Sequence, residues 1–474
     1  MDESRTRRLR KIPFPDTYVL IICLMLLAVV LTHLIPAGTF DRVLDSETGR
    51  EMVQPGTYHT VEQTPVGLGQ FFMAIPTGLL KNAITVFFIF IIGGAFGVVN
   101  ATESLHRLIA RAIQRTNHSS KGGEWVIVLM TMIFCLAGGV IGMAEECIAF
   151  LPILITLSIG LGYDAVIGVA IVMMGVATGY GAAPINPFTV GLAQTIAGLP
   201  MFSGMWLRWI FWAVSTAILS AYLVHYSQKI KKDPTKSLVA DQNYSEFSLQ
   251  DAEGENYALN KRHIATLLVF FGGIALLMIL IIVKSYYLNE LVAYFFVLGI
   301  LCGFIYGMTP NQIAKAFVEG MQQMTYPAIL VGLASGISVI MEQGQILDTV
   351  VFFCSKALDF APTFLKGGIM MLIQSVINLF IPSGTGQAIV TMPLMAPLAD
   401  VAGLTRQVAV FAYQMGDGFS NAIVPTLGML MASISIGKIS YGRWAKFAGK
   451  WLLIQLCVNV LFQIFAAFIN YGPF

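Results

Sequence analysis

The stretch GGVIGMAEECIAF, residues Gly138–Phe150, decides the fold because it sets two adjacent acids between long apolar runs. Glu145 and Glu146 are flanked on both sides by segments that are apolar enough to enter a bilayer. A charged side chain at the centre of a membrane helix costs about 2.5 kcal/mol or more on an insertion scale. Inside a membrane, non-helical backbone is tolerated only where protein or water covers it. We therefore expect these acids at an interruption that faces a cavity.

The composition of the chain indicates a polytopic membrane protein built of α-helices. Of its 474 residues, 56% are hydrophobic and 11% are charged, whereas soluble domains carry about 25% charged residues. The first apolar run, after RTRRLRK, is longer than the core of a secretory signal and lacks a small-residue cleavage site, so we expect it to be retained as a span. The six cysteines have no metal-binding spacing and are expected to be reduced packing residues.

Runs of about 20 apolar residues predict full membrane spans. They occur near residues 17–35, 81–99, 205–226, 264–284, 289–307, 325–341 and 447–469. Clusters of Lys and Arg, which mark the cytoplasmic side, place the N-terminus and the hydrophilic linker 227–263 in the cytoplasm. We therefore expect a multi-pass protein of the inner cell membrane with a cytoplasmic N-terminus.

Two further regions are apolar but are interrupted by Gly, Pro and polar residues. The clusters of Lys and Arg on either side of these regions determine whether the chain crosses the membrane an even or an odd number of times between them. That parity predicts the same order in each region, which is a hairpin that enters and leaves on one side and then a broken helix. The hairpins are expected at 124–160 and 366–403, and the broken helices at 164–200 and 406–436. The second hairpin then enters from the side opposite to the first.

The two halves of the chain resemble each other at a nearly constant offset. IGGAFGV at Ile92–Val98 matches VGLASGI at Val331–Ile337, and Gly179 matches Gly418, in both cases 239 positions apart. We therefore predict four parts, which are a first repeat at 1–226, the cytoplasmic linker 227–263, a connecting span at 264–284 and an inverted second repeat at 285–474. Inverted repeats with discontinuous helices indicate a secondary transporter whose site lies at the membrane midplane.

The motifs GMAEECIAF, GLGYD, INPF and IPSGTGQA resemble those of the YfcC-like carriers. These carriers belong to the C4-dicarboxylate anaerobic carrier family of the ion transporter superfamily, and the resemblance covers nearly the whole chain. It implies an elevator-type fold, in which a scaffold that forms a homodimer holds a mobile transport domain with both hairpins. It leaves the substrate open, because relatives include dicarboxylate carriers and arginine/ornithine-type exchangers. Some relatives use Ser-Asn-Thr tips for sodium, whereas this chain has Glu-Glu and Ser-Gly-Thr.

The interruptions of the hairpins and broken helices carry the candidate binding residues. If these points converge on one cavity, half-helix ends and freed backbone groups add partial charges to it. The predicted substrate-binding residues are Glu145, Glu146, Asn186, Ser383, Gly384, Thr385, Gln387, Asp417 and Asn421. The predicted ion- or proton-coupling residues are Glu145, Glu146 and Asp417. No catalytic residue, metal ligand or nucleic-acid partner is expected.

The candidate residues also have structural interpretations. Glu145 and Glu146 could cap the helix that follows the tip, since the helix dipole favours acids there. Asp417 and Asn186 could satisfy local backbone groups.

Three charged residues outside these interruptions are given structural roles. Asp164, in GLGYD, is expected to cap a helix near the cytoplasmic surface. Arg208 and Arg406 are expected near the external ends of spans, where long side chains reach the interface.

The predicted cavity holds three acids and no Lys, Arg or His, so its fixed charge favours a cationic substrate. We therefore predict a secondary active transporter that works by alternating access, a basic amino acid exchanger of the arginine/ornithine type. The alternative is a proton- or sodium-coupled transporter of C4-dicarboxylates or other carboxylates, in which the acids bind the coupling ion beside the anion. No cofactor is expected, and Na⁺ or H⁺ is the candidate coupling ion.

Other classes of protein fit the sequence less well. An intramembrane aspartyl protease would need a GxGD motif, but Asp417 follows QMG and Asp164 lies near the surface. A channel would need a filter sequence, which is absent. Because no zinc spacing, phosphate-binding loop or nucleophile elbow occurs, we do not expect an enzyme.

Overall fold

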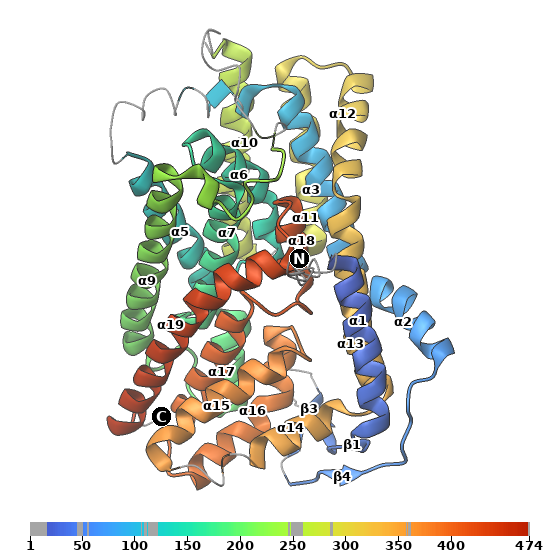
Figure 1. Ribbon diagram of the computed structural model, residues 1–474, viewed down its shortest axis with the longest axis vertical. Coiled ribbons are helices and arrows are strands. Elements are labelled where there is room, and N and C mark those ends of the chain that lie inside the picture. The colour runs from blue at the N-terminus through green and yellow to red at the C-terminus, as the bar shows by residue number, and fades with distance from the viewer. Residues whose placement is uncertain are drawn as a thin grey trace, which may run out of the picture.

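Long helices run along the longest axis of the molecule in the computed structural model (Figure 1). The structure describes residues 17–44, 51–54, 56–105, 107–108, 111, 122–244, 247, 259–284, 288–356, 358 and 362–472. Among these residues, six helices are long and apolar enough to cross a membrane. The expectation of a helical, multi-pass membrane protein is confirmed, with two small two-stranded sheets in addition. The basic cluster at residues 5–11, which predicts a cytoplasmic N-terminus, lies outside the described residues.

In the part of the chain that the structure describes, all four strands precede the linker. Strand β1 pairs with β4, and β2 pairs with β3, both antiparallel. The elements are α1 (Thr17–Leu34), β1 (Gly38–Thr39), β2 (Arg42–Leu44), β3 (Glu51–Val53), β4 (His59–Thr60), α2 (Leu68–Lys81), α3 (Ala83–Ala101), α5 (Gly122–Leu136), the π-helical turn η1 (Ala137–Ile141), the 3₁₀ helix η2 (Glu145–Phe150), α6 (Leu151–Gly160), α7 (Ala165–Gly181), the π-helical turn η3 (Pro187–Gly191), α8 (Leu192–Ile196) and α9 (Met205–Lys232).

The part of the chain after α9 begins with the linker, which contains the short 3₁₀ helix η4 (Pro234–Lys236). The helices that follow are α10 (Lys261–Lys284), α11 (Leu288–Tyr306), α12 (Pro310–Gln323), α13 (Thr325–Gln343), α14 (Leu347–Lys356), α15 (Thr363–Asn378), α16 (Gly384–Val401), α17 (Arg406–Ser420), α18 (Gly428–Ile436) and α19 (Tyr441–Phe468). Helices α2, α12 and α14 have no counterpart among the expected spans, because they are too short to cross a membrane alone.

The helices on either side of the linker pack in a reciprocal pattern. Helix α2 lies along α13, and α12 lies along α3, each as one of the most extensive helix contacts in the molecule. Small residues make this approach possible, since a Cβ on Gly97 would lie 2.8 Å from Cα of Gly320. The GGAFG stretch at Gly93–Gly97 therefore serves close helix packing.

The two broken helices lie between the arms of the helical pairs that precede them. Helix α7 contacts both α5 and α6, and α17 contacts both α15 and α16. Helices α7 and α17 also cross each other, at Gly181 and Gly418. This crossing brings together the segments in which helical structure is interrupted, between α7 and η3 and between α17 and α18.

The strand segment is tied to α14 at the end of the molecule that carries α15 and α16 (Figure 1). Arg42 donates from Nη2 to both carboxylate oxygens of Asp348, at 3.0 and 2.9 Å. The backbone N–H of Phe40 donates to the same carboxylate. The ring of Tyr58 stacks on Phe352 with centroids 3.9 Å apart. These contacts join residues about 300 positions apart, so no local pattern predicts them.

The first part of the linker lies on the ends of α7 and α19. Asp164 caps α7 by accepting from the N–H of Ile167, as expected, and also accepts from Tyr226 and Ser237. Asp241 accepts two hydrogen bonds from Arg443, at 2.6 and 2.7 Å. The Arg443 guanidinium holds the pKa of Asp241 below its ordinary value, so this pair is ionised at neutral pH.

We expect Arg443→Gln to loosen the linker. Trypsin cleavage after Lys236 should then accelerate about two- to fivefold, because an exposed ion pair contributes only modestly. The measurement is timed digestion of the purified protein. Lys446→Gln is the matched control, since it removes one positive charge from the same exposed face of α19 without breaking a hydrogen bond that the described residues show. Equal cleavage rates for the two variants would contradict this docking.

Candidate functional site

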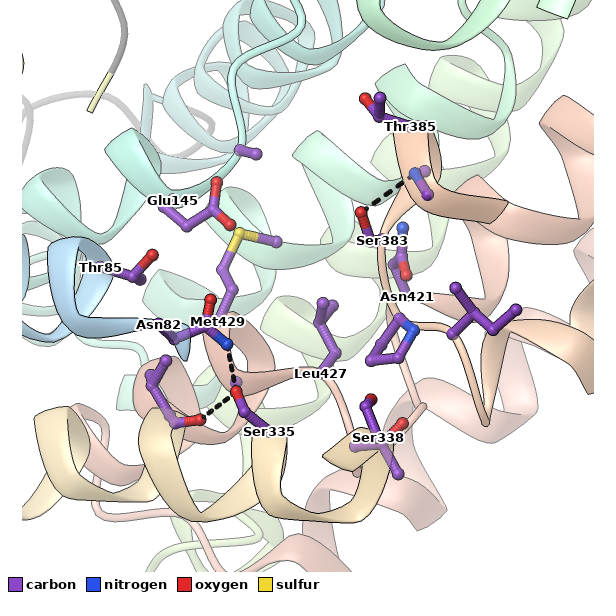
Figure 2. Close-up of a pocket in the computed structure, with 18 of the residues that line it drawn as sticks. Asn82, Thr85, Glu145, Ser335, Ser338, Ser383, Thr385, Asn421, Leu427 and Met429 are labelled. Atoms are coloured by element: carbon purple, nitrogen blue, oxygen red, sulfur yellow. Dashed lines mark hydrogen bonds between the residues drawn. The ribbon is translucent and has the colours of Figure 1, made fainter. Parts of the chain in front are cut away.

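A cavity of about 530 Å³ lies where both broken helices and both helical pairs meet α2, α3 and α13. In Figure 2, Glu145 and Thr85 lie on one side of it, and Ser383, Thr385 and Asn421 lie on the other. Its polar lining comprises Lys81, Asn82, Thr85, Glu145, Glu146, Tyr180, Thr189, Ser335, Ser338, Glu342, Ser383, Thr385, Asn421 and Thr426. Six of the predicted binding residues therefore reach this cavity, namely Glu145, Glu146, Ser383, Gly384, Thr385 and Asn421.

The first interruption, at the tip of the first hairpin between η1 and η2, is shaped by a glycine and a tyrosine. The π-helical turn η1 ends at Gly142, whose φ of 75° is a left-handed conformation that glycine adopts at little cost. The freed carbonyl of Gly142 accepts a 2.6 Å hydrogen bond from Tyr180 of α7. Glu145 then begins η2, and Glu146 accepts from the N–H of Ala144 at 2.7 Å. Both acids are partly exposed and line the cavity.

The second interruption, at the tip of the second hairpin between α15 and α16, directly precedes α16. Ser383 caps this helix by accepting from the N–H of Gly386 at 3.3 Å. The hydroxyl of Thr385 donates to the carbonyl of Phe188, which belongs to the first broken helix. Tyr413 of α17 donates to the carbonyl of Gly384 at 2.6 Å. The tip of α16 is therefore held by both broken helices, and the hydroxyl of Thr385 is engaged within the protein.

Three predicted binding residues do not line the cavity. Asn186 caps η3, accepting from the N–H groups of Phe188 and Thr189, and donates to Gly138. Gln387 is fully buried and donates to Gln374. These two side chains support the interruptions.

Asp417 is the third residue outside the cavity lining. It is 1% exposed and lies behind the second tip, with Oδ2 3.0 Å from where a Cβ on Gly384 would stand. Its Oδ1 has no hydrogen-bond partner among the described residues. The acids therefore form two groups, with Glu145 and Glu146 in the cavity and Asp417 buried beneath its wall.

The expectation that no basic residue lines the cavity is wrong. Lys81, the last residue of α2, reaches the cavity and forms a 2.5 Å ion pair with Glu342 of α13. Next to this pair, Asn82 donates to Ser335, as the dashed line in Figure 2 shows. The sequence did not predict that Lys81 lines the cavity, because Lys81 precedes an apolar run and is typical of the end of a span. Only the packing of α2 along α13 turns it toward the cavity.

The interpretation of Arg208 as an interfacial side chain is also wrong. Arg208 is fully buried, and it donates to the carbonyl of Pro184 at 3.1 Å and to Tyr471 at 3.2 Å. Pro184 lies in the interruption of the first broken helix, so this guanidinium holds that interruption in place. Arg406 is partly exposed, pairs with Asp400 and donates to the carbonyl of Ala197 at 2.9 Å.

We expect Arg208→Gln to destabilise the protein by about 1–3 kcal/mol, because it leaves the buried carbonyl of Pro184 without its donor. The measurement is thermal unfolding in detergent. Lys315→Gln serves as the control, since it removes a cation from an exposed ion pair, with Glu319, that contributes less than about 1 kcal/mol. If both variants unfold at the same temperature, the buried guanidinium does not hold this interruption.

The site offers no arrangement typical of a metal centre. Across the part of the chain that the structure describes, no group of three His, Cys, Asp or Glu side chains could hold a metal ion. What the cavity offers is carboxylates, one ammonium group, hydroxyls and amides around a space that fits a small polar solute.

Comparison with known proteins gives one family and several relatives. The model of the DcuC family, the C4-dicarboxylate anaerobic carriers, matches residues 14–468. YfcC of Escherichia coli (strain K12), to which basic amino acid antiport has been attributed, is 31% identical, with 99% of each chain covered. The Alcanivorax borkumensis YdaH transporter is similar with a TM-score of 0.42 and 16% identity, over 97% of this chain and 100% of that one.

A second solved structure is also similar. Neisseria gonorrhoeae MtrF, described as illuminating a class of antimetabolite efflux pumps, has a TM-score of 0.41 and 18% identity, over 98% of this chain and 97% of that one. Because the family model covers nearly the whole chain, the chain belongs to the C4-dicarboxylate anaerobic carrier family.

Proposed function

We propose that the protein is a secondary active transporter that exchanges basic amino acids across the inner membrane. The observation that carries this proposal is the pair Glu145 and Glu146 on the cavity wall. The basic group of the lining, Lys81, is paired with a third acid, Glu342. The fixed charge of the cavity is therefore negative, and a cationic side chain offsets it. The relative YfcC, to which basic amino acid antiport has been attributed, supports the same substrate class.

The packing supports transport by alternating access. The reciprocal contacts of α2 with α13 and of α12 with α3 are those expected of two inverted repeats. In this proposal the helices α1–α3 and α10–α13 form the scaffold of a homodimer, and α5–α8 with α15–α18 form the mobile transport domain. The N-terminus lies in the cytoplasm.

Asp417 is the proposed coupling residue. A buried carboxylate without a hydrogen-bond donor must carry a proton or meet a cation, and Oδ1 of Asp417 lacks a donor among the described residues. Na⁺ or H⁺ would bind there, behind the tip that faces the substrate.

The test is counterflow in proteoliposomes. Vesicles that contain the purified protein are loaded with unlabelled arginine and then given labelled arginine, ornithine or succinate outside. We expect accumulation of labelled arginine and ornithine that depends on the internal amino acid. Accumulation of succinate alone would overturn the proposal.

A proton- or sodium-coupled carboxylate transporter is the second candidate. The family description names C4-dicarboxylates, and Lys81 could meet one carboxylate of such a substrate. A dianion would then face Glu145 and Glu146, whose charge a coupling cation would have to offset. The succinate arm of the counterflow experiment, with and without a sodium or proton gradient, tests this candidate.

A further inference from the structure

We infer that the ion pair Lys81–Glu342 binds the zwitterionic head group of the substrate, its α-carboxylate and α-ammonium, while Glu145 and Glu146 face the cationic side chain. This inference rests on the proposed function and adds to it a specific substrate chemistry, that of a free α-amino acid. All four residues line the same cavity.

The pair has unused hydrogen-bonding capacity. An ammonium group carries three N–H donors, and among the described residues the structure gives Lys81 one acceptor, Oε1 of Glu342. A carboxylate offers about four acceptor positions, of which Lys81 occupies one. The side chain of Lys81 is 45% exposed and that of Glu342 is 50% exposed. Both groups can therefore take a further partner without giving up each other.

The charges of the pair complement those of an α-amino acid head group. The α-carboxylate would accept from Lys81, and the α-ammonium would donate to Glu342. Each charge of the head group would therefore face the opposite charge of the pair. A dicarboxylate satisfies only Lys81 and repels Glu342, and a simple diamine satisfies only Glu342. The pair thus selects zwitterions, whatever the rest of the cavity selects.

The rest of the lining offers less to a carboxylate. At the second tip, the hydroxyl of Thr385 donates to Phe188, whereas that of Ser383 accepts from Gly386 and offers a carboxylate only an uncharged O–H. Among the residues that line the cavity, Lys81 is the basic side chain.

The pair is not required to hold its helices together. Helices α2 and α13 are already in close contact at Gly78, where a Cβ would lie 2.6 Å from the carbonyl of Gly332. Exposed ion pairs contribute little to stability. An ion pair that lines a cavity and adds little to packing is available for recognition.

The experiment measures competition against labelled arginine uptake in proteoliposomes. One competitor is agmatine, which lacks the carboxylate, and the other is 5-guanidinopentanoate, which lacks the α-ammonium. For the wild-type protein we expect each to bind about 10- to 100-fold more weakly than arginine, the usual effect of losing a charge-assisted hydrogen bond.

The variants separate the two contacts. Lys81→Gln should lose the discrimination against agmatine and keep that against 5-guanidinopentanoate, and Glu342→Gln should do the reverse. Lys315→Gln is the matched control, because it breaks the exposed pair with Glu319 on α12, outside the cavity lining. If a variant does not transport, its relative affinities for arginine, agmatine and 5-guanidinopentanoate are taken from ligand-induced shifts of its unfolding temperature. Lys81→Arg is then the charge-preserving comparison.

The outcomes distinguish this inference from the proposed function. If the wild-type protein exchanges arginine but both variants discriminate as it does, the inference is overturned and the proposed function stands. The same holds if the wild-type protein accepts agmatine as well as arginine. If the wild-type protein transports no basic amino acid, both are overturned.

Discussion

Gly418→Ala is expected to prevent the protein from folding to its native state. A Cβ at this position would overlap the backbone N and Cα of Gly181, in the helix that α17 crosses. Overpacking of an ordinary core site costs about 1–3 kcal/mol. Here the obstacle is backbone, which cannot rotate away, and α7 and α17 are each held between two further helices. We therefore expect a cost at or above the upper end of that range.

The measurement is the yield of monodisperse protein in detergent, followed by thermal unfolding of what remains. Gly272→Ala, in α10, is the control, because a Cβ there would meet nothing within 4 Å. Replacing this helical glycine should be neutral or stabilising, by about 0.5–1 kcal/mol. Gly181→Ala should fall between the two, because its Cβ would meet the movable ring of Phe419. A native unfolding temperature for Gly418→Ala would contradict the close crossing.

The second large effect concerns transport. We expect Glu145→Gln and Glu146→Gln each to raise the KM for arginine by about 10- to 100-fold, and the double variant to abolish measurable exchange. Each substitution keeps the size of the side chain but removes a charge that faces the cavity, and hydrogen bonds to charged groups are worth about 1.5–3 kcal/mol. Initial rates of arginine exchange in proteoliposomes give the KM and the maximal rate.

The control for this prediction is Glu319→Gln, which removes an acid from α12, outside the cavity lining. Its KM should remain that of the wild-type protein. Saturable arginine exchange by the double variant with an unchanged KM would show that these acids do not bind the substrate.

The sequence located the interruptions that surround the cavity, because their signals are local. Two acids inside an apolar run have no favourable place against lipid, and Glu145 begins η2 at the point where the chain leaves η1. Likewise, the tip of the second hairpin was predicted at Ser-Gly-Thr, and there Ser383 caps α16. These features follow from the residues themselves and from the chain next to them.

The environment of several charged side chains was decided by the tertiary structure. Lys81 faces the cavity because α2 lies along α13, a helix whose ion-pairing residue, Glu342, is 261 positions away. Arg208 is buried and donates hydrogen bonds to Pro184 and Tyr471, although its place near a span end suggested an interfacial side chain.

By itself, the sequence determined a helical membrane protein with helices interrupted at polar residues, since hydrophobicity and helix-breaking residues act over a few turns. Only the tertiary structure decided which charges share one cavity. Asp417 was expected beside Glu145 and Glu146, yet it lies behind Gly384, because the tip of α16 passes between it and the cavity. The charge balance of a site depends on distances of a few ångströms between distant segments, and those distances are set by packing across the whole fold.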